Sequence, residues 1–359
     1  MMTMTAKTLT VFAAAAMLAT PILAQQRAGA RLPAECREEI AALCGAPGLG
    51  DRAQMRTCLS QKSAELSDTC AAALNERMAA RGQREGAGRR DGAGSTIGAV
   101  RPQTMAYGSD PLQALDLWTV RGAKPAPLVL FVHGGGWKRG SKDTAGSRTL
   151  PGHLTAQGYA FASINYRLVP DATVEQQAAD VAAALAHLLE RADKFGIDRS
   201  RVVLTGHSAG AQLVALVGTD EQYLRAAGLS FADIDGVMPN DGAAYDVPTQ
   251  MQQAGRFMAH TYEQAFGTDV ARQKALSPTL HAAAPNAPAF LLLHVQREDG
   301  VAQANALAAA LKRSGTRVEI GSFEGEGLRG HAEINRRLGE PDYPATPVMD
   351  EWLKTVFGR

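Results

Sequence analysis

The stretch that decides the fold is Leu204-Thr-Gly-His-Ser208-Ala-Gly-Ala-Gln212, where a Gly-x-Ser-x-Gly motif stands between two apolar segments. The preceding segment, 201–205, is short and β-branched and predicts a strand. The following segment, 209–218, is rich in Ala, Leu and Val without proline and predicts a helix. Glycines on both sides of the serine permit the sharp strand-to-helix turn of a nucleophile elbow. Such a turn would hold the Ser208 hydroxyl out above the end of the sheet.

A second glycine-rich motif lies upstream, where the apolar segment 128–132 runs into His133-Gly-Gly-Gly-Trp137. Three successive glycines leave backbone N–H groups uncovered by side chains, so these groups can bind a developing negative charge. We expect the N–H groups of Gly135 and Gly136, together with that of Ala209 after the serine, to form an oxyanion hole. A phosphate-binding loop would require Gly-Lys-Ser/Thr at this point, and the sequence does not supply it.

Together these motifs resemble those of the α/β-hydrolase family, in particular its His-Gly-Gly-Gly esterase branch. The chain is similar there to bifunctional feruloyl and acetyl-xylan esterases, with kynurenine formamidases as neighbours. The resemblance runs over 107–357 and includes Tyr107-Gly-Ser-Asp-Pro-Leu-Gln113 and Asn165-Tyr-Arg-Leu-Val-Pro170. It implies a doubly wound, mostly parallel sheet and a triad in the order serine, acid, histidine. Trp137 and Tyr166 are the candidate substrate contacts.

The candidate general base is His331. Of the eight histidines it alone lies beyond residue 294. It follows the strand-like segment 318–323 and a glycine-rich stretch, 325–330, which predicts a loop. A base on a loop at the carboxyl edge of the sheet could reach the nucleophile, so His331 is predicted to activate Ser208.

The acid is expected after the apolar strand 289–295, and two residues there compete. The usual Gly-x-x-Asp register gives Glu298, whereas the Arg-x-Asp pattern of the resembling branch gives Asp299. We favour Asp299, with Glu298 as the alternative. Three other carboxylates precede this strand and are therefore predicted to be structural: Asp180, Asp241 and Asp246.

The rest of the region alternates between strand and helix patterns, as a doubly wound sheet requires. Segment 245–266 carries Met, Phe and Tyr at helical spacing, which predicts core packing or a wall of the pocket. The remaining strands are expected at 160–164, 236–240 and 318–323, and the remaining helices at 174–194, 303–314 and 348–357.

The composition and the first 24 residues indicate where the protein is located. The 359 residues are 45% hydrophobic with a net charge of +1, which offers no footprint for nucleic acid or an anionic membrane. Lys7, the apolar run 9–19 and a small residue at Ala24 predict a secretory signal cleaved near Ala24. No later segment is expected to span a bilayer, so the sequence predicts an exported protein, periplasmic or secreted.

Cysteine usage agrees with export, because all four cysteines lie upstream of the hydrolase region. An even set in an exported chain predicts two disulfides, and the lack of Cys-x-x-Cys argues against a zinc site. We expect a nested pairing that staples a small helical hairpin. The segment resembles a cysteine-rich repeat of a Golgi glycoprotein, which implies a cell-surface or protein partner. The expected pairs are Cys36 with Cys70 and Cys44 with Cys58.

The predicted organisation has four parts. A signal peptide at 1–24 precedes the cysteine-rich helical segment at 25–80. A Gly/Arg-rich stretch without an apolar period makes 81–101 a flexible linker. The catalytic α/β domain follows at 102–359.

Three functions remain open from the sequence. The favoured one is a serine hydrolase of short acyl or aryl esters that needs no metal or organic cofactor. A second is an amidohydrolase, either like an arylformamidase or, with less support, a dipeptidyl-type peptidase. The third is an exported binding protein in which the hydrolase domain is vestigial, and the intact Ser, His and Gly-Gly-Gly set argues against it.

Overall fold

The protein is described by a computed structural model that covers residues 33–44, 66–67, 69–71, 101–120, 122, 124–143 and 145–358. Two compact units divide the chain, Met1–Thr96 and Ile97–Arg359. The predicted signal peptide and Cys58 lie outside the described residues, and so does all of the predicted linker except Arg101.

The first unit contains α1 (Ala34–Cys44) and a disulfide between Cys36 and Cys70. Both half-cystines are buried, and Ile40 and Leu66 pack against them. Such a small core buries little apolar area, so the covalent link supplies stability that packing alone would not. The outer pair of the nested arrangement is therefore confirmed. Cys44 is also disulfide-bonded.

The second unit is built on an eight-stranded sheet with the order β1-β2-β4-β3-β5-β6-β7-β8. The pairs β1–β2 and β2–β4 are antiparallel, and all other neighbours are parallel, which confirms the predicted mostly parallel sheet. The strands are β1 (Gln103–Ala106), β2 (Ala114–Trp118), β3 (Ala126–Val132), β4 (Ala160–Ile164), β5 (Ile197–His207), β6 (Gly236–Asn240), β7 (Ala289–Gln296) and β8 (Arg317–Glu326).

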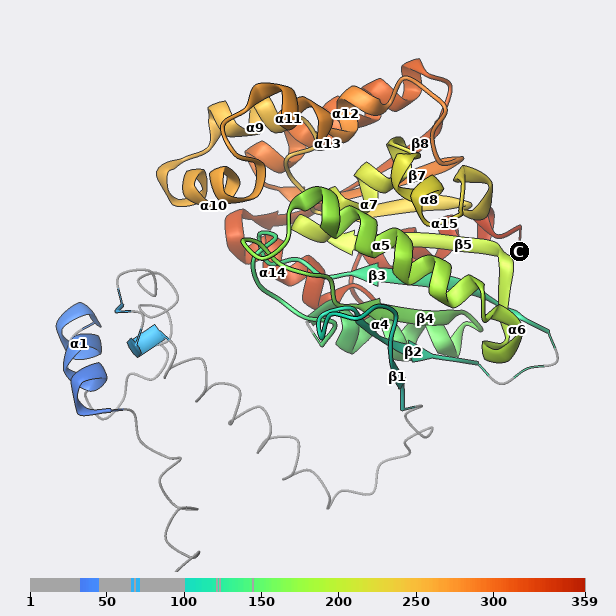
Figure 1. Ribbon diagram of the computed structural model, residues 1–359, viewed down its shortest axis with the longest axis horizontal. Helices are drawn as coiled ribbons and strands as arrows, with labels where there is room; N and C mark the ends of the chain where they lie inside the picture. Colours follow the sequence, from blue (N-terminus) through green and yellow to red (C-terminus); the bar gives the residue numbers. More distant parts are fainter. Residues whose placement is uncertain are drawn as a thin grey trace, which may run out of the picture. The chain divides into compact units, whose positions relative to one another are not determined.

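Helices cover both faces of this sheet (Figure 1). Every residue of β3 is buried, and its side chains alternate between two cores. Leu128 and Leu130 point into a core that includes α5 (Val174–Leu189), α7 (Ala209–Thr219) and α13 (Glu298–Arg313). The intervening β3 side chains point into a second core with α4, α14 and α15. These helices span Ala145–Ala156, Gly327–Arg337 and Ala345–Val356.

A helical insertion connects β6 to β7 and contains the segment predicted as core or pocket wall. Tyr262 and Phe266 of α10 are buried there, and both rings contact Trp137, so this part of the segment belongs to the core. The insertion consists of α9 (Val247–Gln253), α10 (Arg256–Phe266), α11 (Val270–Ala275) and α12 (Pro278–His281). Two short helices lie elsewhere, α6 (Ala192–Phe195) and α8 (Gln222–Ala226), and a 3-10 turn spans Phe231–Asp233.

No helix within the described residues has the length and apolarity needed to cross a bilayer.

The division into two units leads to a testable expectation about the disulfides. Reduction with dithiothreitol should leave hydrolysis unchanged, because no cysteine lies beyond Cys70 and a disulfide chiefly restricts the loop that it closes. A chain that begins at Arg101 should likewise keep full activity towards a soluble ester. Loss of activity in the shortened chain, with its circular dichroism and melting temperature unchanged, would show that the cysteine-rich segment completes the site.

Candidate active site

Ser208 stands at the turn between β5 and α7 with φ of 57° and ψ of −119°, a backbone conformation that is unfavourable for a residue with a side chain. The flanking glycines make this turn possible. A Cβ on Gly210 would lie 2.1 Å from the carbonyl oxygen of Val132, and one on Gly206 would lie 2.4 Å from the oxygen of Gly210. The predicted nucleophile elbow is therefore the observed local structure.

His331 lies beside Ser208, with its Nε2 atom 3.0 Å from the serine Oγ. The sequence predicted a loop here, but His331 belongs to the second turn of α14, which begins directly after β8. The glycines allow this tight connection: a Cβ on Gly330 would lie 2.4 Å from the backbone of Gly325. The helix places the imidazole at the carboxyl edge of the sheet, as expected for the base.

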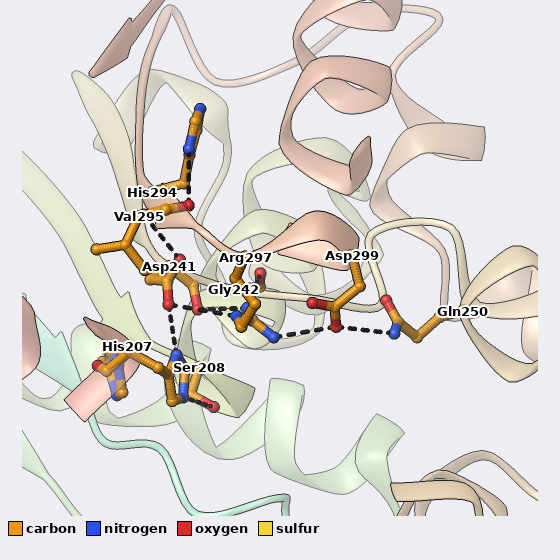
Figure 2. A network of polar contacts seen from close by, with 10 residues as sticks. His207, Ser208, Asp241, Gly242, Gln250, His294, Val295, Arg297 and Asp299 are labelled. Atoms are coloured by element: carbon orange, nitrogen blue, oxygen red, sulfur yellow. Dashed lines mark hydrogen bonds and ion pairs between the residues drawn. The ribbon is translucent and has the colours of Figure 1, made fainter. Parts of the chain in front are cut away.

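Asp241 is the carboxylate that contacts His331, and its Oδ2 atom lies 2.5 Å from the imidazole Nδ1. It follows β6 directly and is fully buried. Its other carboxylate oxygen accepts a hydrogen bond of 3.1 Å from the backbone N–H of Val295, and its own N–H donates to the oxygen of Leu293. The neighbouring strand β7 thus fixes the acid on both sides (Figure 2).

The prediction that Asp299 contacts the imidazole is wrong. Asp299 lies in the first turn of α13, and its carboxylate accepts hydrogen bonds from Arg297 Nη1 at 3.0 Å and Gln250 Nε2 at 3.2 Å. The alternative, Glu298, is exposed to solvent. The interpretation of Asp241 as purely structural also fails, because parallel pairing brings the ends of β6 and β7 to one edge of the sheet.

The charge state of Asp241 follows from its surroundings. Burial by itself would raise the pKa of this carboxyl group, but the hydrogen bond from His331 and the positive charge of Arg297 outweigh burial and lower it. The carboxylate therefore stays ionised. An ionised acceptor at Nδ1 fixes the imidazole tautomer that leaves Nε2 free to take a proton from Ser208.

His207 is a neighbour of Ser208, His331 and Asp241 that the sequence did not single out. Its Nε2–H donates to the backbone oxygen of His331 at 3.0 Å, and the two rings lie 4.3 Å apart. Burial and the nearby His331 lower the pKa of His207 well below its usual value, so the ring is neutral. The signal was its place inside the Gly-x-Ser-x-Gly motif, directly before the serine.

The glycine loop after β3 passes directly over the nucleophile. A Cβ on Gly134 would lie 2.9 Å from the Cβ of Ser208, so this approach requires glycine. Gly135 and Gly136 have φ of 127° and 61°. Their N–H groups and that of Ala209 have no hydrogen-bond acceptor within the described part of the chain. These three groups remain the predicted oxyanion hole.

Trp137 and Tyr166 were predicted to contact substrate, but both are buried supports of the glycine loop. Trp137 Nε1 donates to Gln212 Oε1 at 3.0 Å. The Tyr166 hydroxyl donates to the backbone oxygen of His133 at 2.9 Å, and the two rings are stacked. Both rings belong to the hydrophobic core, where Trp137 packs against Tyr262 and Phe266.

His207, Asp241 and His331 form a cluster with ligand atoms within 4.8 Å of one another, which is the spacing of a metal site. Both ring nitrogens of His331 already have protein partners, Asp241 and Ser208. A metal ion bound by this cluster would have to displace the hydrogen bond between His331 and Asp241. The donor set therefore fits proton transfer better than coordination.

In the α/β-hydrolases a serine at a strand-to-helix turn is hydrogen-bonded to a histidine that follows a later strand of the same parallel sheet. This chain has that arrangement. The chain is a member of this class, within its esterase branch. More narrowly, it belongs to the BD-FAE family, which matches residues 115–311.

Individual relatives agree with this assignment. Esterase LipC of Mycobacterium tuberculosis is 32% identical over 236 residues, which are 63% of this chain and 58% of that protein. Kynurenine formamidase of Danio rerio is 30% identical over 112 residues, which are 31% of this chain and 36% of that protein. The chain therefore matches little more than half of the length of LipC and about a third of the formamidase.

Solved structures show the same fold. Esterase B from Lactobacillus rhamnosis superimposes with a TM-score of 0.59 at 24% identity, covering 83% of this chain and 95% of the esterase. A truncated carbohydrate esterase from gut microbiota gives a TM-score of 0.60 at 18% identity, covering 74% of this chain and all of that one.

Proposed function

We propose that the protein is a serine carboxylesterase with Ser208 as nucleophile, His331 as general base and Asp241 as acid. The observation that carries this proposal is the pair of hydrogen bonds that joins the three side chains, 3.0 Å from Ser208 to His331 and 2.5 Å from His331 to Asp241. Acyl transfer requires a nucleophile, a base and a group that orients the base, joined in this way by hydrogen bonds.

The reaction follows from these positions. His331 takes the proton of Ser208 as the hydroxyl attacks the ester carbonyl, and Asp241 stabilises the imidazolium that forms. The N–H groups of Gly135, Gly136 and Ala209 bind the oxyanion. The alcohol leaves with the proton from His331, and water then hydrolyses the acyl-enzyme by the same route.

We propose short acyl or aryl esters as substrates, of the kinds that the resemblance to feruloyl and acetyl-xylan esterases implies. A match to an esterase over 236 residues supports ester hydrolysis. The match to a kynurenine formamidase favours a second candidate, hydrolysis of an N-formyl amide by the same triad. We also propose export, which the predicted signal at 1–24 and the Cys36–Cys70 disulfide support.

A panel of p-nitrophenyl esters, feruloyl and acetyl-xylan esters and N-formylkynurenine tests the proposal. We expect the highest kcat/KM on one of the esters. A higher kcat/KM on N-formylkynurenine would favour the second candidate.

Covalent labelling tests the nucleophile independently of the substrate. A serine-directed phosphonate should add one group to the intact protein, and peptide mapping should find it on Ser208. Absence of labelling, together with no turnover across the panel, would instead support a binding protein with a vestigial hydrolase domain.

A further inference from the structure

Arg297 reaches Asp241 from the end of β7 and is not explained by the triad itself. Its side chain is 14% exposed, and its Nε atom lies 3.6 Å from Asp241 Oδ2, the oxygen that also contacts His331. Its Nη2 donates to the backbone oxygens of Asp241 at 3.3 Å and Gly242 at 3.0 Å. The guanidinium therefore holds both the carboxylate and the backbone of the acid (Figure 2).

The guanidinium is itself fixed from the far side. Its Nη1 donates to Asp299 Oδ2 at 3.0 Å, and Asp299 also accepts from Gln250 Nε2. Gln250 is buried on α9, and its Oε1 accepts from the N–H of Ala244 at 3.2 Å. Figure 2 shows this line of contacts from Asp241 through Arg297 to Gln250. A planar fork bound at both ends loses most of its freedom before any substrate arrives.

One atom of the guanidinium remains unsatisfied. The buried Nε of Arg297 has no hydrogen-bond partner within the described residues, although Asp241 Oδ2 lies close to it. Leaving a buried donor unpaired costs free energy, so the position demands a reason. Catalytic hydrogen bonds are often long in an unliganded site and tighten when charge develops. During the reaction Asp241 must keep its Oδ2 atom at the imidazole Nδ1, and Arg297 lies beside that same oxygen.

We propose that Arg297 is a positioning residue that keeps Asp241 oriented towards His331 during acyl transfer, and that Asp299 and Gln250 hold Arg297 in place. The inference rests on the proposed function, because it assigns Arg297 a role only if Asp241 is the acid. It also gives Asp299, the carboxylate that the sequence favoured, a supporting place, separated from the imidazole by Arg297 and Asp241.

The charges around Asp241 predict how replacement of Arg297 would change the pH dependence of the reaction. Burial raises the pKa of Asp241, whereas the hydrogen bond from His331 and the charge of Arg297 lower it. Removing Arg297 takes away one of these lowering effects, so the carboxylate is protonated at higher pH. The acid limb of kcat/KM, where it reflects protonation of Asp241, should therefore move to higher pH. The titratable and charged groups that act on Asp241, or on which it acts, are Arg297, His331, His207, Tyr245 and Tyr343.

Three variants test the proposal on the full chain. Arg297→Met should lower kcat about 100-fold, because small misplacements of a catalytic group cost that much, with little change in KM. Its acid limb should shift upward. Arg297→Lys keeps the charge without the fork, so it should restore the acid limb and only part of kcat. The matched control is Arg225→Met, an exposed arginine of α8 paired with Glu221, which should behave as wild type.

The outcomes separate this inference from the proposed function. A wild-type protein that neither hydrolyses esters nor labels at Ser208 would refute the proposed function itself. An active wild type whose Arg297→Met variant keeps kcat and the acid limb would overturn the role of Arg297 alone. If melting shows that Arg297→Met does not fold, Arg297→Lys decides, and wild-type kcat in that variant would equally overturn the role.

Discussion

Replacing Ser208 with Ala lowers kcat by about a million-fold if Ser208 is the nucleophile, and His331→Ala does the same, since members of a triad act as a unit. The double variant should be no worse than either single one. Residual hydrolysis should come from the glycine loop and from substrate binding alone. Pre-steady-state release of p-nitrophenol measures the effect most directly, because the acyl-enzyme burst should disappear with Ser208.

The exposed residue Ser200, which hydrogen-bonds only to Asp198 in the described structure, supplies the control. Ser200→Ala should keep both the burst and the phosphonate label. Retention of more than about a tenth of kcat in Ser208→Ala would refute the elbow assignment, because the losses seen for triads are several orders larger. Melting temperatures of all variants should stay close to that of the wild type, since Ser208 and His331 contribute geometry rather than core packing.

Local sequence was sufficient for the parts of the site that backbone conformation dictates. The elbow needs glycine before and after Ser208, and the loop after β3 needs glycine at Gly134, where a side chain would collide with Ser208. Both requirements are short-range, so they are visible as Gly-x-Ser-x-Gly and Gly-Gly-Gly. The sequence likewise predicted a parallel sheet. Short apolar runs typical of strands alternate in it with longer runs of helical period.

The parts that depend on tertiary neighbours could not be predicted in the same way. Asp241 becomes the partner of His331 because the end of β6 lies beside the end of β7, a fact of pairing rather than of spacing. Trp137 turns inward because it packs against Phe266 and donates to Gln212, and Tyr166 because it stacks on His133. His331 lies on α14 rather than on a loop because Gly325 and Gly330 allow an immediate turn into helix. The first two outcomes are decided by residues that are distant in sequence, and the third is decided by the glycines of a nearby turn.

The sharpest remaining test compares Asp241→Asn with Asp299→Asn. In the wild type one oxygen of Asp241 accepts from the N–H of Val295 and the other contacts His331 Nδ1. Asparagine has a single acceptor oxygen. If that oxygen keeps the Val295 bond, its NH₂ group faces Nδ1 and forces the imidazole into the tautomer with a proton on Nε2. The imidazole then cannot accept the proton of Ser208, and kcat should fall about 10⁴-fold.

Asp299→Asn is the matched change, one carboxylate further along the same line of contacts. Its loss should be small, about tenfold at most, because Asn can still accept from Arg297 and misplacement is then slight. Glu298→Gln, at an exposed position, should be silent. Steady-state kcat on one p-nitrophenyl ester ranks the three variants. A ranking with Asp299→Asn most damaging would return the acid to α13 and would require His331 to turn away from Asp241 in the working enzyme. The buried, doubly bonded carboxylate of Asp241 opposes that rotation, since it would leave an ionised group without its strongest partner.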